Sequence, residues 1–374
     1  MSATGPGPSR RMRVLVVNAG SSSLKLRVLD PDDSVVASFD LPVVRGQADV
    51  APTTKAVRGV GGIDAVGHRI VHGGTMFRGP VRIDPGVEAQ LRALTDLAPL
   101  HQPKSLAALD AVSAVLPDLP AVASFDTAFH ADMPAAAATY AVPIEWRERW
   151  GVRRYGFHGL SHAYAGRRAA EMLGRPQEGL RVVTCHLGAG ASLCAVLDGR
   201  SVDTTMGFTP LEGLVMATRS GNVDPGLVMW LLQHAGLGHE ELADALEHRS
   251  GLHALAGTSD MRQVLEAADE GSADAQLALE VYIHRLRAGV ASMAAAMEGM
   301  DVLVFTGGVG ERAPAVRELA AEGLGFLGIG VDSDANEASG GDRDISAAEA
   351  RVRSLVVEAR EDLEIAREVR SVLG

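Results

Sequence analysis

The chain has 374 residues, a formal net charge of -12 at pH 7 and only two cysteines, Cys185 and Cys194. This length suffices for two or three domains, and the negative charge argues against tracking nucleic acid or binding an anionic membrane surface. The cysteine spacing matches neither a zinc cluster nor a disulfide framework, and no apolar run reaches the length of a membrane span. We therefore expect a cytoplasmic protein without a nucleic-acid or membrane partner.

Short apolar strands alternate with amphipathic helices along the chain, which predicts the α/β class. Residues 1–11 are rich in glycine, proline and serine and are expected to form a flexible tail. Strands are expected at 13–17, 121–125, 181–185, 301–305 and 354–359. Helices are expected at 86–98, 104–116, 161–173, 273–300 and 361–373. Pro134 and the four alanines after it mark the expected boundary between two halves.

Two segments of the chain repeat one pattern. RVLVVNAGSSSLKLRVLD (13–30) aligns without a gap with RVVTCHLGAGASLCAVLD (181–198). Each segment predicts a β-hairpin whose strands flank a turn of small residues. The backbone N–H groups of such a turn can bind an anion. Chance similarity between two buried hairpins is the alternative explanation.

The first turn contains polar groups suited to phosphate. It is not a P-loop, because Lys25 leads into a strand and not into a helix. Backbone amides near Gly20, the serine hydroxyls of 21–23 and the Lys25 ammonium group are donors for phosphate oxygens, and the Asn18 carboxamide can reach a hydrated cation. A polar turn in solvent is the alternative.

A series of motifs resembles the acetate kinase family from about Val14 to Arg370. In chain order they are NAGSSSLK, GHRIVHGG, LAPLH, FDTAFH, YGFHGLSH, CHLGAGAS, TTMGFTPLEGL, TRSGNVDP and FTGGVGER. The resemblance implies an α/β fold of two duplicated ribonuclease H-like, actin-like ATPase domains with a cleft between them. It also implies Mg²⁺ or Mn²⁺, ATP or ADP as co-substrate, and a homodimer. The implied reaction is reversible phosphoryl transfer between ATP and acetate, giving ADP and acetyl phosphate.

The same resemblance divides the chain after the tail. The N-terminal ribonuclease H-like domain is expected at 12–133, with the C-terminal helix 363–374 packing back on it. The nucleotide-binding and dimerisation domain is expected at 134–362.

Phosphorylation of a carboxylate needs positive charge more than it needs a general base. Acetate is already ionised at neutral pH, so the obstacle is repulsion between two anions. Arg69 and Arg219 are planar fixed charges suited to this, and the resemblance assigns them substrate binding and transition-state stabilisation. His158, helped by His101, would donate to the phosphoryl group. Asp126 matches a family residue assigned to proton transfer, but we favour a role in orienting an arginine.

The resemblance also implies the remaining parts of the site. A methyl pocket would be formed by Val71, Leu100, Phe157 and Pro210. The metal ion would be held by Asn18 and Glu361, with Asp362 as the neighbouring alternative to Glu361. The nucleotide would contact Ser21, Lys25, His186, Leu187, Gly188, Ala189, Gly190, Asp260, Met261, Arg262, Gly308, Val309, Gly310, Glu311 and Arg312.

The chain departs from the family pattern in three places. Ala189 and Arg312 stand where asparagine is usual, and the stretch between about Leu41 and Gly62 is short. The loss of a side-chain amide at Ala189 is expected to weaken nucleotide binding. Three other functions stay open: a propionate or other short-chain acyl kinase, a non-catalytic ATP-dependent switch, and a serine acyl hydrolase using one of the serines 21–23, although no G-x-S-x-G elbow surrounds them.

Each candidate also has an ordinary structural explanation. An isolated arginine is most often a surface or ion-pair residue, and a histidine among apolar neighbours is most often part of the core. His158 and His162 have the spacing of a metal-binding helix, but the glutamate of H-E-x-x-H is missing.

Overall fold

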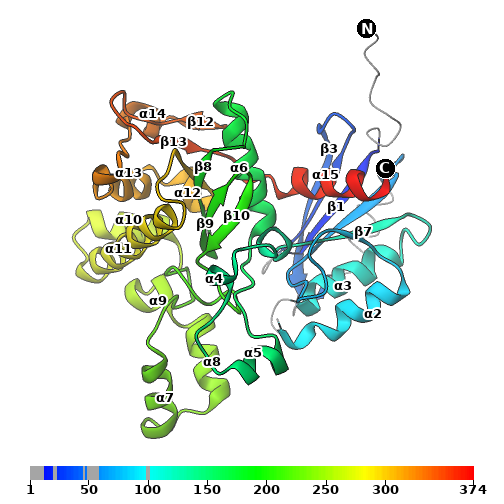
Figure 1. Ribbon diagram of the computed structural model, residues 1–374, viewed down its shortest axis with the longest axis horizontal. Helices are drawn as coiled ribbons and strands as arrows, with labels where there is room; N and C mark the ends of the chain where they lie inside the picture. Colours follow the sequence, from blue (N-terminus) through cyan, green and yellow to red (C-terminus); the bar gives the residue numbers. More distant parts are fainter. Residues whose placement is uncertain (1–11, 20–22, 45–46, 49–58, 98–101) are drawn as a thin grey trace. The chain divides into compact units, whose positions relative to one another are not determined.

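The computed structural model describes residues 12–19, 23–44, 47–48, 59–97 and 102–374 (Figure 1). The chain separates into two compact units, and each contains one mixed β-sheet. Unit 1 comprises 1–131, 159–164 and 360–374, and unit 2 comprises 132–158 and 165–359. The tail expected at 1–11 lies outside the described residues. So do three of the expected site residues, Ser21, Leu100 and His101.

Unit 1 contains a sheet with the strand order β4-β3-β2-β1-β5-β7-β6. β1 is antiparallel to β2 and parallel to β5, which is itself parallel to β7. The strands are β1 (Val14–Ala19), β2 (Ser23–Leu29), β3 (Val35–Val44), β4 (Gln47–Ala48), β5 (Ala65–Ile70), β6 (Val81–Arg82) and β7 (Ala121–Phe125). The helices are α2 (Pro85–Ala93), α3 (Gln102–Ser113) and α15 (Glu361–Leu373), with short 3₁₀ turns η2 (Thr95–Leu97) and η3 (Ala128–His130).

Unit 2 contains a second sheet, ordered β10-β9-β8-β11-β13-β12. Its strands are β8 (Arg181–Leu187), β9 (Ala191–Leu197), β10 (Arg200–Thr204), β11 (Val302–Thr306), β12 (Arg343–Asp344) and β13 (Arg353–Val356). Its helices are α4 (Ala135–Ala138), α5 (Ile144–Trp150), α7 (Pro225–His234), α8 (His239–His248), α9 (Gly251–Ala256), α10 (Met261–Asp269), α11 (Ala273–Ala296), α12 (Gly307–Arg312), α13 (Pro314–Glu322), η4 (Gly325–Leu327) and α14 (Ser333–Glu337). The first residues of α6 (Gly159–Met172) belong to unit 1 and the rest to unit 2.

The two sheets share one topology. In each, a central strand is antiparallel to the next strand in sequence on one side and parallel to a later strand on the other. A further parallel strand follows, β7 in unit 1 and β13 in unit 2. This confirms the predicted α/β class and the duplicated ribonuclease H-like fold.

Both predicted hairpins are present, but their registers differ by one residue. Val14 pairs with Leu29, whereas Val182 pairs with Val196 and not with Leu197, the position that the ungapped alignment equates with Leu29. The paired ends show why: Ala19 pairs with Leu24, but Leu187 pairs with Ala191, so the second hairpin closes over one residue fewer. The sequence repeat therefore reproduces the strands but not their cross-strand partners.

Several predicted elements have different ends or a different form. The helix expected at 86–98 ends at Ala93 and is followed by η2, and the helix expected at 273–300 ends at Ala296. The glycine-rich stretch after β11 forms the short helix α12. Within the described parts of the chain, no helix combines the length and apolar character needed to cross a membrane.

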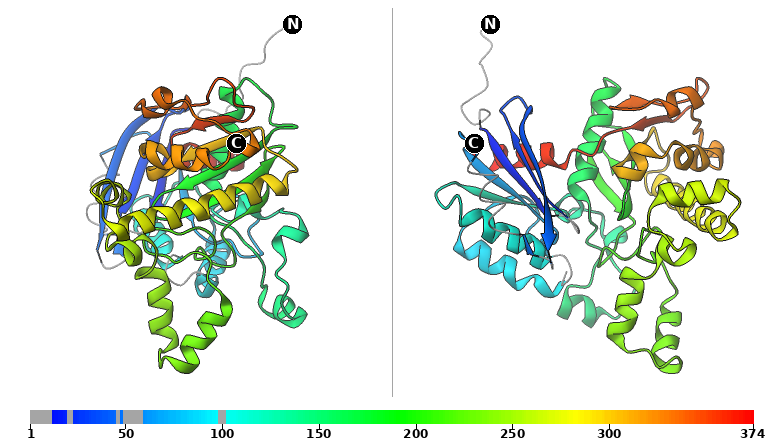
Figure 2. Two further views of the ribbon diagram at one scale, coloured as in Figure 1. Left: turned by 90° about the vertical axis from the view of Figure 1, so that its left-hand side faces the viewer. Right: turned by 180° about the vertical axis from the view of Figure 1, so that it is seen from behind.

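The unit 1 sheet is covered on both faces. On one face, Ile365, Ala366 and Val369 of α15 pack against Val14 and Val16 of β1. On the other face, Ala108 and Val112 of α3 pack with Leu15 and Val17 of β1. Figure 2 shows the cyan α3 and the red α15 beside the blue strands of this sheet. Because successive side chains in a strand point to opposite faces, β5 also contributes to both layers.

We expect Gly67→Ala to destabilise unit 1. A Cβ atom at Gly67 of β5 would lie 2.5 Å from Cγ2 of Ile365 and 2.7 Å from Cγ2 of Val369, which α15 holds in place. Overpacking of this kind costs about 1–3 kcal/mol of unfolding free energy. Urea unfolding should show the loss, while Gly61→Ala, where a Cβ would meet nothing within 4 Å, should unfold like the unaltered protein. Equal midpoints for the two variants would contradict this packing.

Candidate active site

The unit 1 candidates gather at one edge of its sheet. Asn18 lies near the end of β1, Arg69 near the end of β5, and Asp126 directly after β7. Since these strands are parallel, their carboxyl ends meet at the same edge. Glu361, the first residue of α15, completes the group.

Arg69 and Asp126 form a two-point ion pair. Arg69 donates from Nε to Asp126 Oδ1 at 3.0 Å and from Nη2 to Oδ2 at 2.5 Å. The Asp126 side chain is 1% exposed and that of Arg69 is 14% exposed. Arg69 Nη1 also donates to Asn18 Oδ1 at 3.1 Å. The guanidinium group is therefore fixed from β1 and from the end of β7.

The electrostatics of this pair are dominated by burial and mutual attraction. Burial lowers the pKa of Arg69, but the negative charges of Asp126 and Glu361 outweigh burial and raise it above the ordinary value. Burial raises the pKa of Asp126, and Arg69 opposes that shift. Two parallel N–H···O bonds are the geometry of a guanidinium with an ionised carboxylate. With both oxygens engaged, Asp126 is placed to orient Arg69.

Asn18 and Glu361 provide oxygen atoms of the kind that Mg²⁺ prefers. Asn18 Nδ2 donates to Glu361 Oε2 at 2.7 Å, so the two side chains are adjacent. Mg²⁺ is usually held by one or two carboxylates, with water and phosphate oxygens filling its other positions. Among the described residues, no group of three or more His, Cys, Asp or Glu is arranged to hold a metal ion. The Glu361 carboxylate is thus a ligand of the type that Mg²⁺ uses, whereas the Asn18 oxygen also accepts a hydrogen bond from Arg69.

His158 is the central candidate of unit 2. Its ring stacks on that of His186, with centroids 4.3 Å apart, and its Nδ1 lies 2.9 Å from the Ser192 hydroxyl oxygen. His158 precedes α6 with a φ of 56°, a left-handed conformation uncommon for a residue other than glycine. If Ser192 donates to Nδ1, the imidazole proton is on Nε2, the nitrogen that faces away from Ser192.

The turn after β8 lies against both His158 and Arg219. A Cβ atom built on Gly190 would be 3.2 Å from His158 Cε1 and 3.5 Å from Arg219 Nη1. Arg219 Nη1 donates to the Pro210 carbonyl oxygen at 3.0 Å, and Nε lies 3.4 Å from Glu247 Oε2. The structure thus brings together the second glycine turn, a histidine and an arginine.

The glycine helix α12 adjoins the same turn. A Cβ atom on Gly307, at a φ of 78°, would meet the Leu187 carbonyl oxygen at 2.8 Å. At its other end, the buried Arg317 donates from Nη1 to the carbonyl oxygens of Gly310 and Glu311, and from Nε to Asn336. Burial lowers the pKa of Arg317 to about 10. A cation at a helix C-terminus is favourable, so Arg317 holds α12 in place.

The other nucleotide candidates differ in exposure. Asp260 caps α10 and forms an ion pair with Arg262, which is 83% exposed, while Met261 between them is buried. Lys25 is exposed on β2, opposite Asn18. Ala189, Gly308 and Arg312 are exposed, whereas Leu187 and Gly310 are buried. Glu311 accepts a hydrogen bond from the Ala359 N–H group at 2.9 Å.

The expected methyl-pocket residues belong to both units. Val71 is buried in unit 1, and Phe157 and Pro210 are buried in unit 2. His162 also lies in unit 1, where its ring packs edge-on against that of His130.

Three supporting residues were not identified from the sequence. Ser192 lies inside the motif CHLGAGAS, and its closeness in sequence to the glycine turn could have marked it as a site residue. Glu247 and Arg317 gave none, because their partners Arg219 and Asn336 are brought to them only by folding.

Comparison with known proteins points to one family. Residues 49–367 match the model of the acetokinase family. The chain is 43% identical to the acetate kinase of Trichormus variabilis over 399 aligned positions, covering 96% of this chain and 98% of that protein. The acetate kinase structure from Porphyromonas gingivalis is similar with a TM-score of 0.89 at 37% identity, covering 97% of this chain and all of the other. A propionate kinase structure from Francisella tularensis has the same TM-score of 0.89 at 34% identity, covering 97% of this chain and all of the other.

We expect Asp126→Ala to be far more damaging to stability than Asp110→Ala. Both aspartates pair with an arginine at 2.5 Å, but the Arg92–Asp110 pair is about half exposed. Leaving Arg69 buried without its partner should cost about 3–5 kcal/mol, whereas an exposed pair contributes about 0–1 kcal/mol. Urea unfolding of both variants measures the difference. Similar losses in the two would show that Arg69 does not depend on Asp126.

Proposed function

The chain belongs to the acetokinase family, and we propose that it transfers a phosphoryl group reversibly between ATP and acetate. The products of the forward reaction are ADP and acetyl phosphate. The observation that carries this proposal is the closeness of His158 and Arg219 to Gly190, because it brings two cationic or N–H donors to a glycine turn of a type that can bind an anion.

The reaction needs no proton transfer. A carboxylate oxygen of acetate forms a bond to the γ-phosphorus, the bond from that phosphorus to the bridging oxygen breaks, and the electron pair stays on ADP. Both reactants are anions, so the protein's contribution is orientation and charge stabilisation. The engagement of both Asp126 oxygens by Arg69 supports a positioning role for Asp126 and not a role as general base.

We assign acetate binding to Arg69. A guanidinium group has five N–H donors, and three of those of Arg69 are used by Asp126 and Asn18. The two that remain suit the two oxygens of a carboxylate. Arg219 and His158 would then bind the transferring phosphoryl group, with Glu247 and Ser192 holding their orientation.

The nucleotide would occupy unit 2. Its phosphates would contact the backbone of Gly188–Gly190 and the start of α12, and its other parts would approach Asp260, Arg262 and Gly308–Arg312. A Mg²⁺ ion held by Glu361 and Asn18 would neutralise phosphate charge when bound. We also propose, from membership of the family, domains at 12–133 and 134–362, a homodimer and a cytoplasmic location.

Propionate is the second candidate substrate. A propionate kinase structure is as similar to the chain by TM-score as an acetate kinase structure. The two acids differ by one methylene group, so the choice between them depends on the size of the methyl pocket.

The decisive experiment traps the product. The protein is incubated with ATP, Mg²⁺, acetate and hydroxylamine, and acetyl phosphate is measured as acetohydroxamate. Hydroxamate that requires all of ATP, acetate and a divalent cation, and disappears with EDTA, supports the kinase. ATP hydrolysis without hydroxamate would favour the non-catalytic switch.

In that assay, Arg219→Ala should lose most of its activity while remaining folded. Removal of one donor to a developing charge typically costs about 10²–10³-fold in rate. Arg249→Ala is the matched control, since Arg249 pairs with Asp244 in the same unit and both side chains are 53% exposed. A soluble Arg219→Ala protein with the turnover of the control would refute the assignment.

Shortening Val71 should weaken the preference of the enzyme for acetate over longer carboxylic acids. Val71 is buried and only two residues from Arg69 in sequence. We expect acetate to be used best, propionate less and butyrate least, since an apolar pocket discriminates by about 1–3 kcal/mol per methylene. Val71→Ala should narrow the ratio of kcat/KM between acetate and propionate. Val122→Ala, a buried core residue of β7, should leave that ratio unchanged; a narrowing in both variants would indicate a general loosening of the unit.

A further inference from the structure

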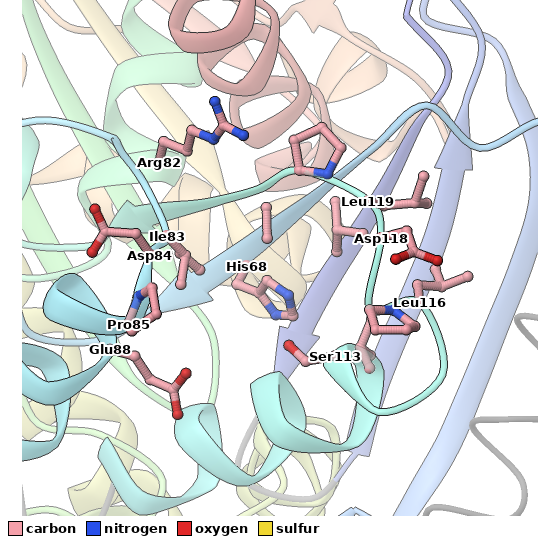
Figure 3. A pocket seen from close by; sticks show the side chains of 15 residues that line it. His68, Arg82, Ile83, Asp84, Pro85, Glu88, Ser113, Leu116, Asp118 and Leu119 are labelled. Atoms are coloured by element: carbon pink, nitrogen blue, oxygen red, sulfur yellow. The ribbon is translucent and has the colours of Figure 1, made fainter.

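Unit 1 contains a cavity of about 380 Å³ that takes no part in the site described above. Its lining comes from β5, β6, the start of α2, the end of α3 and residues 117–121. His68 lies in its middle, with Ser113 and Leu116 on one side and Ile83 and Pro85 on the other (Figure 3). Such a volume is at the lower end of the range for small-molecule sites.

The cavity opens on the face of β5 opposite to Arg69. Gly67 faces Ile365 and Val369 of α15, while Val66 packs with Ala108 and Val112 of α3. Alternation along the strand then places His68 with Val66 on the α3 side and Arg69 with Gly67 on the α15 side. The cavity and the Arg69 cluster therefore lie on different faces of one strand.

His68 is a buried polar side chain that finds no hydrogen-bond partner among the residues that the structure describes. It is 2% exposed, and neither Nδ1 nor Nε2 has a hydrogen-bond partner within the described chain. Burial lowers the pKa of His68 to about 4, so the ring is neutral at pH 7 and has one N–H donor and one acceptor nitrogen. An unsatisfied buried polar group costs about 1–3 kcal/mol, which a leucine at this position would avoid. Its presence beside a cavity indicates a polar group that the described part of the chain does not supply.

The walls and the mouth of the cavity restrict what that group belongs to. Val66, Val112 and Leu116 supply apolar surface around His68. Three acidic residues, Asp84, Glu88 and Asp118, line the cavity together with a single basic residue, Arg82. Glu88 is paired with Arg92, which still leaves more negative than positive charge. An anion would be repelled, whereas a cation would be attracted.

We propose that this cavity is a binding site for a small organic amine whose apolar body ends in a hydroxyl group. The hydroxyl hydrogen-bonds to the imidazole of His68, the body lies between Val66, Val112 and Leu116, and the ammonium group faces Asp118, which lies on the same side of His68 as Leu116 (Figure 3). Acetate, nucleotides and other anions are excluded from it. Nothing in this proposal depends on the chemistry proposed for Arg69 and Arg219.

Three related probes test the proposal on the full-length protein. Tyramine has the hydroxyl and the ammonium group, phenethylamine lacks the hydroxyl, and 3-(4-hydroxyphenyl)propionate replaces the ammonium group with a carboxylate. Binding is measured by calorimetry and by the Cε1–Hε1 NMR signal of ¹³C-labelled histidine, with the His68 signal identified by its loss in His68→Leu. We expect a saturable shift with tyramine, binding of phenethylamine weaker by about three- to tenfold, and no shift with the carboxylate.

Variants separate the contributions of the His68 imidazole, the cavity volume and the acidic side chains to amine binding. His68→Leu should unfold at the same temperature as the unaltered protein or higher, and should bind tyramine and phenethylamine equally. Ser113→Trp changes an exposed helix residue and should block the cavity without touching the core. Asp118→Asn should weaken both amines, while Glu270→Gln, an exposed acid in unit 2, should weaken neither.

Several results would overturn the proposal. They are the absence of any saturable shift of the His68 signal, equal binding of the amine and the carboxylate, and a preference for tyramine that survives in His68→Leu or Ser113→Trp. Every readout is a measurement of binding or stability. These results would therefore overturn the proposal whether or not the protein phosphorylates acetate.

Discussion

Parallel pairing of β1 with β5 and of β5 with β7 is the constraint on which the arrangement of the unit 1 candidate residues depends. It brings Asn18, Arg69 and Asp126 from three distant parts of the sequence to one edge of the sheet. Once there, Arg69 is largely buried, and a buried guanidinium needs a paired carboxylate. The ion pair with Asp126 therefore serves the fold and the site at the same time, and α15 adds Glu361 because its apolar face packs on β1.

Unit 2 repeats the topology but uses the same strand ends differently. The end of β8 leads into Gly188–Gly190 and the end of β11 into α12, so glycine-rich backbone lies at this edge where unit 1 carries charged side chains. Its positive charge comes from Arg219, in an irregular segment, and its histidine from the residue before α6. On the proposed function, one scaffold would bind anions through charged side chains in unit 1 and through a glycine turn together with Arg219 and His158 in unit 2.

Each of the two candidate arginines forms an ion pair with a carboxylate of its own unit. Asp126 holds Arg69 through two hydrogen bonds, and Glu247 lies 3.4 Å from Arg219. A carboxylate in this position reduces the positive field at the site but fixes the direction of the guanidinium donors. For transfer between two anions, donors that are already oriented avoid a reorganisation cost during the reaction. On the proposed function, Asp126 and Glu247 are positioning residues, and the roles of all site residues stay predictions until the variants are measured.

The sequence by itself determined the elements that depend on local pattern. The strand 121–125 and the helix 361–373 have the predicted ends, and alternation with small-residue turns was enough to predict both hairpins, because such patterns reflect contacts between neighbours in the chain. Only the tertiary structure decided the one-residue difference in hairpin register, the helical form of Gly307–Arg312, and the partners of Arg219 and Arg317. It also decided that His68 has no partner within the described chain. The pairing of Arg219 with Glu247 and of Arg317 with Asn336, and the surroundings of His68, depend on groups far apart in the sequence, and the free energy of such contacts leaves no local periodicity from which they could be predicted.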